Sequence, residues 1–181
     1  MKHIMVDLET LGRHAGCKIL SIGAVEFGPR GLGAEFYVRV LRDQQGDLHE
    51  DPDTVRWWSG QADVAKAELF ASDEGKLPLA AALVQFNDWL LRIGDKDEKG
   101  QLKVGVWGNG ADFDNAILNV ASAEVGVRQA WPFWGNRCYR TLKGLRPAIK
   151  LARVGTYHNA LDDAKSQAEH AVRIMQELNA W

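Results

Sequence analysis

The chain of 181 residues has 46% hydrophobic and 25% charged residues, a composition typical of an ordinary folded protein that excludes a largely disordered one. Its net charge of −2 excludes an extensive nonspecific grip on duplex nucleic acid, which needs many Lys and Arg residues, but allows a small local site. With no long apolar run and an N-terminus that leads directly into a strand pattern, we expect a single domain over residues 1–181, no membrane segment or signal peptide, and a cytoplasmic location.

The first ten residues predict a β-strand with two acids in it. Side chains alternate across a strand, so Ile4, Val6 and Leu8 should face one side, and Asp7 and Glu9 the other. Two neighbouring carboxylates repel each other, and a divalent cation such as Mg²⁺ or Mn²⁺ stabilises such a pair. The alternative is an edge strand with one solvated face, which the Asp-x-Glu spacing on its own favours.

The remaining elements predict a mixed sheet. Short turns connect the first strand to two more, at 18–27 and 34–41, which indicates an antiparallel meander in which Gly23 marks a bulge or a close approach. The elements expected after it are a short helix capped by Asp53 or Thr54, helices at 62–70 and 79–93, a charged loop at 95–100, and a buried strand at 104–107. Three more helices are expected, at 113–125, at 141–151 with an interruption at Pro147, and at 161–178. This order implies an α/β fold with a central sheet flanked by helices in three layers. The two cysteines, Cys17 and Cys138, are expected to be buried or half-buried free thiols.

A second pair of acids, Asp112 and Asp114, stands where a buried strand leads into a helix. Acids in the first turn of a helix are favoured by the helix dipole, so capping alone explains one of them. One cap suffices, which leaves the other acid without a structural reason.

A third group precedes the last helix and contains His158, Asp162 and Asp163. Histidine exchanges protons near neutral pH, and beside acids it is suited to take a proton from water. The alternative is that Asn159 and Asp162 cap the helix and that the histidine lies on the surface.

The three groups together resemble the motifs of the DEDDh 3′–5′ exonucleases, whose fold is ribonuclease H-like. An acid-x-acid pair on the first strand, an acid after Asn109-x-x-x-Phe113, and His158-x-x-x-x-Asp163 occur in the family's order. The resemblance extends from Met1 to about residue 175, nearly the whole chain.

Two further patterns refine the resemblance. Tyr157 has Leu161 at the spacing where the Tyr variant of the superfamily carries an acid, so the His variant fits better. Asp53-x-x-x-Trp57-Trp58 is similar to the phage and bacterial exoribonuclease-like subgroup related to ribonuclease T.

The resemblance implies a metal centre. It makes His158 the general base and keeps Asp112 as the alternative to the acid that follows Phe113. The four acids that it implies as ligands of two Mg²⁺ ions, for which Mn²⁺ can substitute, are Asp7, Glu9, Asp114 and Asp163.

The resemblance also implies contacts to a nucleic-acid strand. The residues expected to make them are Leu8, Thr10, Trp57, Trp58 and Phe113. Aromatic rings hold single strands by stacking. For each of Trp57, Trp58, Trp131 and Trp134, core packing is the better-supported alternative. For Leu8, packing in the core is at least as well supported as contact with the strand.

The activity implied is metal-dependent 3′–5′ hydrolysis of single-stranded ends or overhangs of RNA or DNA, releasing nucleoside 5′-monophosphates, with RNA slightly favoured. Relatives of ribonuclease T commonly act as dimers, so a homodimer is a further expectation. The alternatives are an endonuclease of the same fold class and a nucleic-acid-binding module without turnover.

Overall fold

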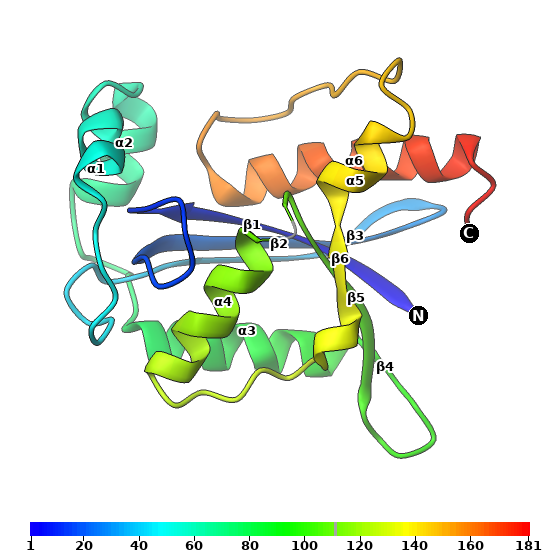
Figure 1. The fold of residues 1–181 in the computed structure, drawn as a ribbon, viewed down its shortest axis with the longest axis horizontal. Helices are drawn as coiled ribbons and strands as arrows, with labels where there is room; N and C mark the ends of the chain where they lie inside the picture. The colour runs from blue at the N-terminus through cyan, green and yellow to red at the C-terminus, as the bar shows by residue number, and fades with distance from the viewer. Residues whose placement is uncertain (111) are drawn as a thin grey trace.

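The computed structural model describes residues 1–110 and 112–181, and within them a six-stranded mixed sheet lies between helices (Figure 1). The strands are β1 (Lys2–Thr10), β2 (Ile19–Gly28), β3 (Gly31–Arg39), β4 (Asp95–Lys96), β5 (Leu102–Gly108) and β6 (Asn136–Cys138). The helices are α1 (Pro52–Ser59), α2 (Asp63–Phe70), α3 (Leu79–Ile93), α4 (Asp114–Glu124), the 3₁₀ helix η1 (Phe133–Gly135), α5 (Tyr139–Gly144) and α6 (Ala160–Glu177).

Strand β1 lies inside the sheet, between β2 and β5, in the order β3-β2-β1-β5-β4, with β6 also paired to β5. The edge-strand interpretation of the first acidic pair is therefore wrong. β1 pairs with β2 antiparallel along its length, whereas its parallel pairing with β5 runs only from Lys2↔Val104 to Met5↔Trp107. The half of β1 that carries Asp7 and Glu9 thus extends past the pairing with β5, at the carboxyl end of both strands, where α/β sheets form crevices for ligands.

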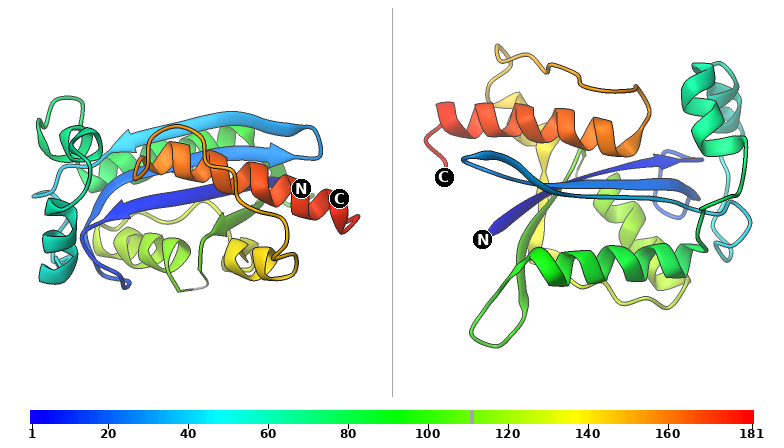
Figure 2. Two further views of the ribbon diagram at one scale, coloured as in Figure 1. Left: turned by 90° about the horizontal axis from the view of Figure 1, so that it is seen from above. Right: turned by 180° about the vertical axis from the view of Figure 1, so that it is seen from behind.

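Helices cover both faces of this sheet, while α1 and α2 lie beyond one end of it (Figure 2). On one face, Ile4, Val6 and Leu8 of β1 pack in a common apolar core with Phe86 and Leu90 of α3. This confirms the predicted alternation along β1, because burial of one set of side chains leaves Asp7 and Glu9 on the opposite face.

On the other face, Met5 packs against α6, whose buried stripe includes Ala164, Ala168 and Ala171. Small side chains let a helix axis approach the sheet closely. Removal of these apolar surfaces from water, at roughly 25 cal/mol per Å², is the main force that holds both helical layers to the sheet.

Gly23 sets the position of the start of α6. Its Cα faces the backbone at Ala160 and Leu161, and a Cβ at this position would overlap those atoms. The predicted close approach is confirmed, whereas the register shifts of β2 lie elsewhere, opposite the Glu9–Thr10 step and between Val25 and Phe27. Because Gly23 is paired with Asp7, this contact brings the first turn of α6 beside the acids of β1.

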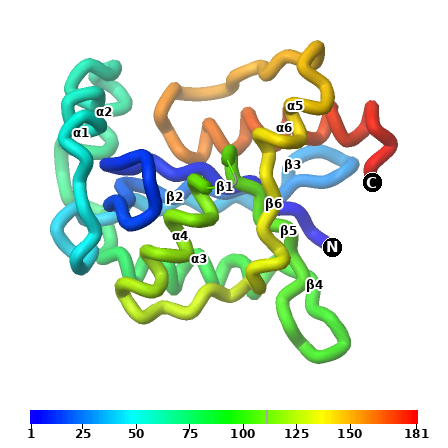
Figure 3. Tube along the Cα trace, in the orientation of Figure 1, coloured from blue at the N-terminus to red at the C-terminus, as the bar shows by residue number. Residues whose placement is uncertain are grey.

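Several element boundaries differ from the prediction. The helix expected at 141–151 is the shorter α5, which ends at Gly144, and residues 145–159 instead cross over α6 to reach its start (Figure 3). Pro147 explains the difference, because it disfavours helical backbone in the preceding residue and lacks the N–H that a continued helix needs. The third strand begins and ends a few residues earlier than predicted, and the loop expected at 95–100 opens with β4.

Helix α1 is capped by Asp51 rather than by Asp53 or Thr54. The Asp51 side chain accepts a hydrogen bond from the Asp53 N–H at 3.0 Å, and Pro52 occupies the first helical position. Proline is favoured there because its missing N–H has no partner in the first turn.

The tryptophans divide between core and surface. Trp58 and Trp131 are buried, as core packing predicts, but Trp57 is 46% exposed and Trp134 is 61% exposed.

Cys17 is buried and Cys138 half-buried, both as free thiols. Among the described residues, no helix combines the length and the apolar character needed to cross a bilayer.

Candidate active site

A cavity of about 580 Å³ opens at the carboxyl end of β1. Nine of the ten residues that the resemblance assigns to the site line it: Asp7, Leu8, Glu9, Thr10, Trp57, Trp58, Phe113, His158 and Asp163. They come from β1, α1, the turn after β5 and the start of α6, which are far apart in the sequence. The tenth, Asp114, lies behind the cavity wall and is 1% exposed.

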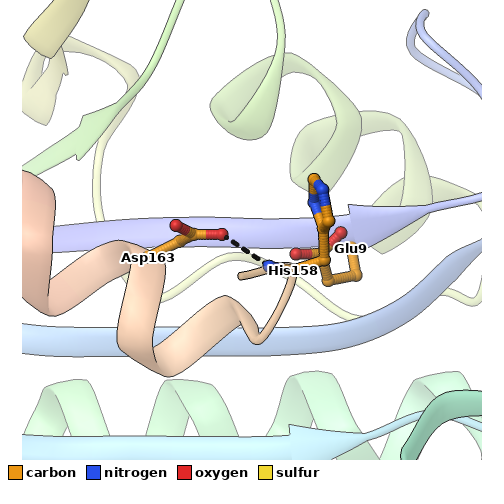
Figure 4. Close-up of side chains that lie close together, drawn as sticks. All are labelled: Glu9, His158 and Asp163. Atoms are coloured by element: carbon orange, nitrogen blue, oxygen red, sulfur yellow. Dashed lines mark hydrogen bonds between the residues drawn. The ribbon is translucent and has the colours of Figure 1, made fainter. Parts of the chain in front are cut away.

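Glu9, His158 and Asp163 form a compact group in the cavity. One ligand atom from each lies within 4.8 Å of the other two, a spacing that suits a shared cation (Figure 4). The backbone N–H of His158 donates to Asp163 Oδ2 at 3.2 Å, which fixes the loop before α6 against the first turn of that helix.

Asp7 is next to this group and is held by α6. Gln167, one turn after Asp163, donates from Nε2 to Asp7 Oδ1 at 2.7 Å. The pKa of Asp7 is raised well above its usual value by burial and by the negative charges of Asp114, Glu9 and Asp163, and the Gln167 hydrogen bond opposes this only in part.

Glu9 and Asp114 also have raised pKa values. Burial and the neighbouring carboxylates of Asp163 and Asp114 raise the pKa of Glu9 to about 8. Burial raises the pKa of Asp114 to about 6, although its Oδ2 accepts a hydrogen bond from the Asn109 N–H at 2.7 Å. Such perturbed carboxyl groups in a cleft are typical of functional sites.

These carboxyl groups fit a divalent cation. Asp114 Oδ1 is buried and has no hydrogen-bond partner among the described residues. A buried polar atom without a partner is costly in free energy, and crowded carboxylates are costly when ionised. A hard cation with oxygen ligands removes both costs at once.

Arg153 is a cavity residue that the sequence analysis missed. It forms an ion pair with Asp163, and its guanidinium lies 4.4 Å from the centre of the Tyr157 ring. Its charge also opposes the rise in the pKa of Glu9. Only its position five residues before His158 could have drawn attention to it, because no periodicity or motif includes it.

The segment that carries Arg153 and His158 is tied to α6. His170 Nε2 bonds the carbonyl oxygen of Ile149 at 2.8 Å, while its Nδ1 bonds the Tyr139 hydroxyl at 2.6 Å. The Ser166 hydroxyl accepts the N–H of Val154 at 3.0 Å. These contacts order a segment that has no regular secondary structure of its own.

His158 has a left-handed backbone, with φ of 62°. This conformation is uncommon outside glycine and places the side chain where a regular helix start would not. Its ring meets the edges of Trp57 and Trp58, with ring centres 4.9 and 5.8 Å away. The predicted cap follows at once, since Asn159 Oδ1 accepts the N–H groups of Leu161 and Asp162.

The two neighbouring tryptophans have different positions in the site. Trp58 is 3% exposed and donates from Nε1 to the carbonyl oxygen of Thr10 at 2.9 Å, so it anchors α1 to the end of β1. Trp57 presents its exposed ring at the cavity edge. Leu8 fits both roles considered for it, packing in the core and contact with the strand, since it belongs to the apolar core and also lines the cavity.

Asp112 and Asp114 are clearly separated by their surroundings. Asp112 is exposed, whereas Asp114 begins α4 and is buried among the other acids. The helix-cap explanation fails for Asp114, because its Oδ2 bonds the N–H of Asn109, outside the helix.

A mixed sheet with helices on both faces and acids at the end of its first strand is the architecture of the ribonuclease H-like exonucleases, which confirms the expected fold class. The chain belongs to the family described as the 3′–5′ exoribonuclease Rv2179c-like domain, whose model matches residues 2–175.

Individual relatives support this placement. The chain is 24% identical to an exodeoxyribonuclease of Enterobacteria phage T4 in an alignment of 167 positions that covers 78% of this chain and 70% of the relative. Its fold is similar to the nuclease domain of 3′hExo, a DEDDh family member, bound to rAMP, with a TM-score of 0.66, 16% identity, and coverage of 97% of this chain and 92% of that one.

Two DNA complexes have similar folds. Exonuclease X in complex with 5′ overhanging duplex DNA matches with a TM-score of 0.60 and 16% identity over 99% of this chain and 93% of that chain. Exonuclease I of E. coli in complex with a dT13 oligonucleotide matches with a TM-score of 0.67 and 14% identity over 98% of this chain but only 42% of that chain.

Proposed function

We propose that this protein is a metal-dependent 3′–5′ exonuclease that hydrolyses phosphodiester bonds at single-stranded 3′ ends or overhangs and releases nucleoside 5′-monophosphates. The observation that carries the proposal is the convergence of Asp7, Glu9, Asp163 and His158 on one cavity, with Asp114 directly behind it. Membership of a family described by 3′–5′ exoribonuclease activity supports the same reaction.

Two Mg²⁺ ions would be held by Asp7, Glu9, Asp114 and Asp163, whose crowding and orphaned oxygen fit such cations. When bound, the ions supply stabilisation of the charge that develops on the phosphate and on the attacking and leaving oxygens. Manganese has similar ligand preferences and should substitute.

The chain's own residues position the reactants and move the proton. His158 takes a proton from the attacking water as its oxygen bonds to phosphorus, and the bond from phosphorus to the O3′ of the preceding nucleotide breaks. The O3′ leaving oxygen takes a proton from water and becomes the new 3′ end. Contacts of the His158 ring with Trp57 and Trp58 hold the imidazole at the cavity.

The exposed ring of Trp57 is suited to stack on a base near the 3′ end, whereas Leu8 and Phe113 offer apolar surface inside the cavity. Stacking does not distinguish RNA from DNA, which depends on contacts to the 2′-hydroxyl. RNA is slightly favoured because the matching family is described as exoribonuclease, although the phage relative is an exodeoxyribonuclease.

The test is hydrolysis of matched single-stranded RNA and DNA, each labelled at the 5′ end, with Mg²⁺, Mn²⁺ or EDTA. A metal-dependent ladder that shortens from the 3′ end is expected, with RNA degraded faster. Asp7→Ala should abolish the ladder, and Glu98→Ala, an exposed acid on the loop after β4, should leave it unchanged. Activity in EDTA, or in Asp7→Ala, would contradict the metal-site assignment.

The competing functions give different results in the same assay. An endonuclease would cut a circular single strand, which an exonuclease must leave intact. A binding module without turnover would hold the labelled strand in Mn²⁺ and yield no product.

A further inference from the structure

A long stretch of the chain, part of which lies beside the site, carries positive charge alone. Between Glu124 and Asp162 there is no Asp or Glu, yet the stretch holds seven of the 22 Lys and Arg residues of a chain whose net charge is −2. It includes β6, α5 and the segment that crosses over α6. Such separation of charge in a slightly acidic protein indicates a local surface for a polyanion.

Arg140 of α5 is fixed against the turn after β5. Its Nη2 donates to the carbonyl oxygen of Asn109 at 2.6 Å, and its guanidinium lies over Gly110, where a Cβ would come within 3.1 Å of Nη2. The missing side chain of Gly110 therefore makes room for the guanidinium. Arg140 remains exposed, so its other N–H groups are available to a ligand.

Lys143, one turn further along α5, points to the same turn. Its Nζ lies 3.4 Å from Asn109 Oδ1 and 5.2 Å from the centre of the Tyr139 ring. Arg140 and Lys143 therefore both contact Asn109. Burial and the positive charges of Arg140 and Arg153 lower the pKa of Lys143. Asn109 and Arg153 both line the acidic cavity, so the cations continue directly from its wall.

Not every basic residue of the stretch belongs to this surface. Arg146 forms an ion pair with Glu177 at 3.2 Å, which neutralises it. Arg140 instead donates to the backbone carbonyl of Asn109, and Lys143 to the side-chain amide oxygen of the same residue. Neither group carries an opposing charge.

From this geometry we infer that Arg140 and Lys143, next to the wall of the cavity, bind the phosphodiester backbone of the strand on the 5′ side of the scissile bond. The inference rests on the proposed function for the direction of the strand. Cations at this position offset the repulsion between a polyanion and the acids of the cavity and set the path by which the strand leaves. They bind phosphates rather than bases, so the surface should be indifferent to sequence.

The test is the double variant Arg140→Gln/Lys143→Gln, with Arg30→Gln/Lys99→Gln as a control of equal charge change. Arg30 is in the β2–β3 turn and Lys99 in the loop between β4 and β5, both exposed. Arg140→Lys/Lys143→Arg keeps the charge and should retain binding. A thermal melt of each variant verifies that it is folded.

The first measurement is anisotropy of a 5′-fluorescein single strand of about 12 nucleotides in EDTA, at salt concentrations from about 50 to 200 mM. The double Gln variant should bind about 10- to 100-fold more weakly. Its plot of log K against log salt should be shallower by about 1.4, since each phosphate contact on a single strand contributes about 0.7. Because no turnover is needed, this result is independent of whether the protein is an exonuclease.

The second measurement is hydrolysis of the nitrophenyl ester of thymidine 5′-monophosphate, which has no phosphate on the 5′ side of its scissile bond. The double Gln variant should hydrolyse it at the wild-type rate, while KM for the longer strand rises. Equal loss on both substrates would place the two residues in the reaction itself and overturn the inference. Unchanged binding and salt dependence, or no binding of the strand by the wild-type protein in EDTA, would overturn it as well.

Discussion

Replacing Glu9 with glutamine should stabilise the metal-free protein at alkaline pH. Burial and its acidic neighbours raise the pKa of Glu9 from 4.5 to about 8, so between these values the folded chain binds more protons than the unfolded chain. The free energy of unfolding must therefore fall as pH rises through this range. At about 1.4 kcal/mol per pH unit, the loss reaches on the order of 5 kcal/mol at pH 8, or on the order of 10 °C in Tm for a domain of this length.

The assay is thermal unfolding in EDTA from about pH 5 to about pH 8, the range in which Glu9 of the unfolded chain is ionised. Glu9→Gln should melt with the wild-type protein near the acidic end and well above it at pH 8, because the neutral amide removes the cost of burying a charge and the repulsion by the neighbouring acids. Mg²⁺ at 100 times its Kd should stabilise the wild-type protein by about 2.7 kcal/mol and the variant by less. Glu98→Gln is the matched control and should follow the wild-type curve.

If Glu9→Gln melts at or below the wild-type temperature at pH 8 in EDTA, the cavity acids do not repel one another as their positions indicate. The wild-type Tm must also fall as the pH rises in EDTA. A Tm that rises between pH 6 and pH 8 would therefore refute the same reasoning.

Three further predictions concern the other cavity residues. Asp114→Asn should lower kcat by about 10²-fold or more, whereas Asp112→Asn should retain activity, since Asp112 is exposed; loss in Asp112→Asn alone would exchange their roles. His158→Ala should lower kcat by about 10²- to 10⁴-fold while the rise in Tm caused by Mg²⁺ persists, and loss of that rise would make His158 a metal ligand rather than a base. Trp57→Ala should raise KM for single strands with little change in Tm, but Trp58→Ala should cost about 3–5 kcal/mol of stability, and the reverse order would contradict their assignment to surface and core.

Local sequence rules account for much of the framework. Alternation along β1 correctly separates Ile4, Val6 and Leu8 from Asp7 and Glu9, because only one register buries the apolar set. The long helices α3 and α6 follow from apolar residues at helical spacing, and the cap at Asn159 follows from its side-chain oxygen. These features depend on neighbours in the chain.

Where the prediction was wrong, contacts distant in sequence decide the outcome. The pattern at 141–151 is helical in spacing, yet α5 ends at Gly144, and the next residues are ordered by His170 and other groups of α6. Trp134 is exposed although a tryptophan usually lies in a core. Pro147 indicates locally that this helix is interrupted, but the contacts that order residues 145–159 and the exposure of Trp134 cannot be read from a local window.

The sequence alone determined the order of the acidic motifs, the strand that carries Asp7 and Glu9, and the helix that begins beside Asp163, because pattern and capping are properties of nearby residues. Only the tertiary structure decided that β1 lies within the sheet, that Arg153 pairs with Asp163, and that Arg140 and Lys143 lie beside the acidic cavity. The physical reason is that the pKa of a carboxyl group and the partner of a cation depend on charges brought close by folding. Those distances are set by contacts such as that of Gly23 with the start of α6, to which no local rule assigns a partner.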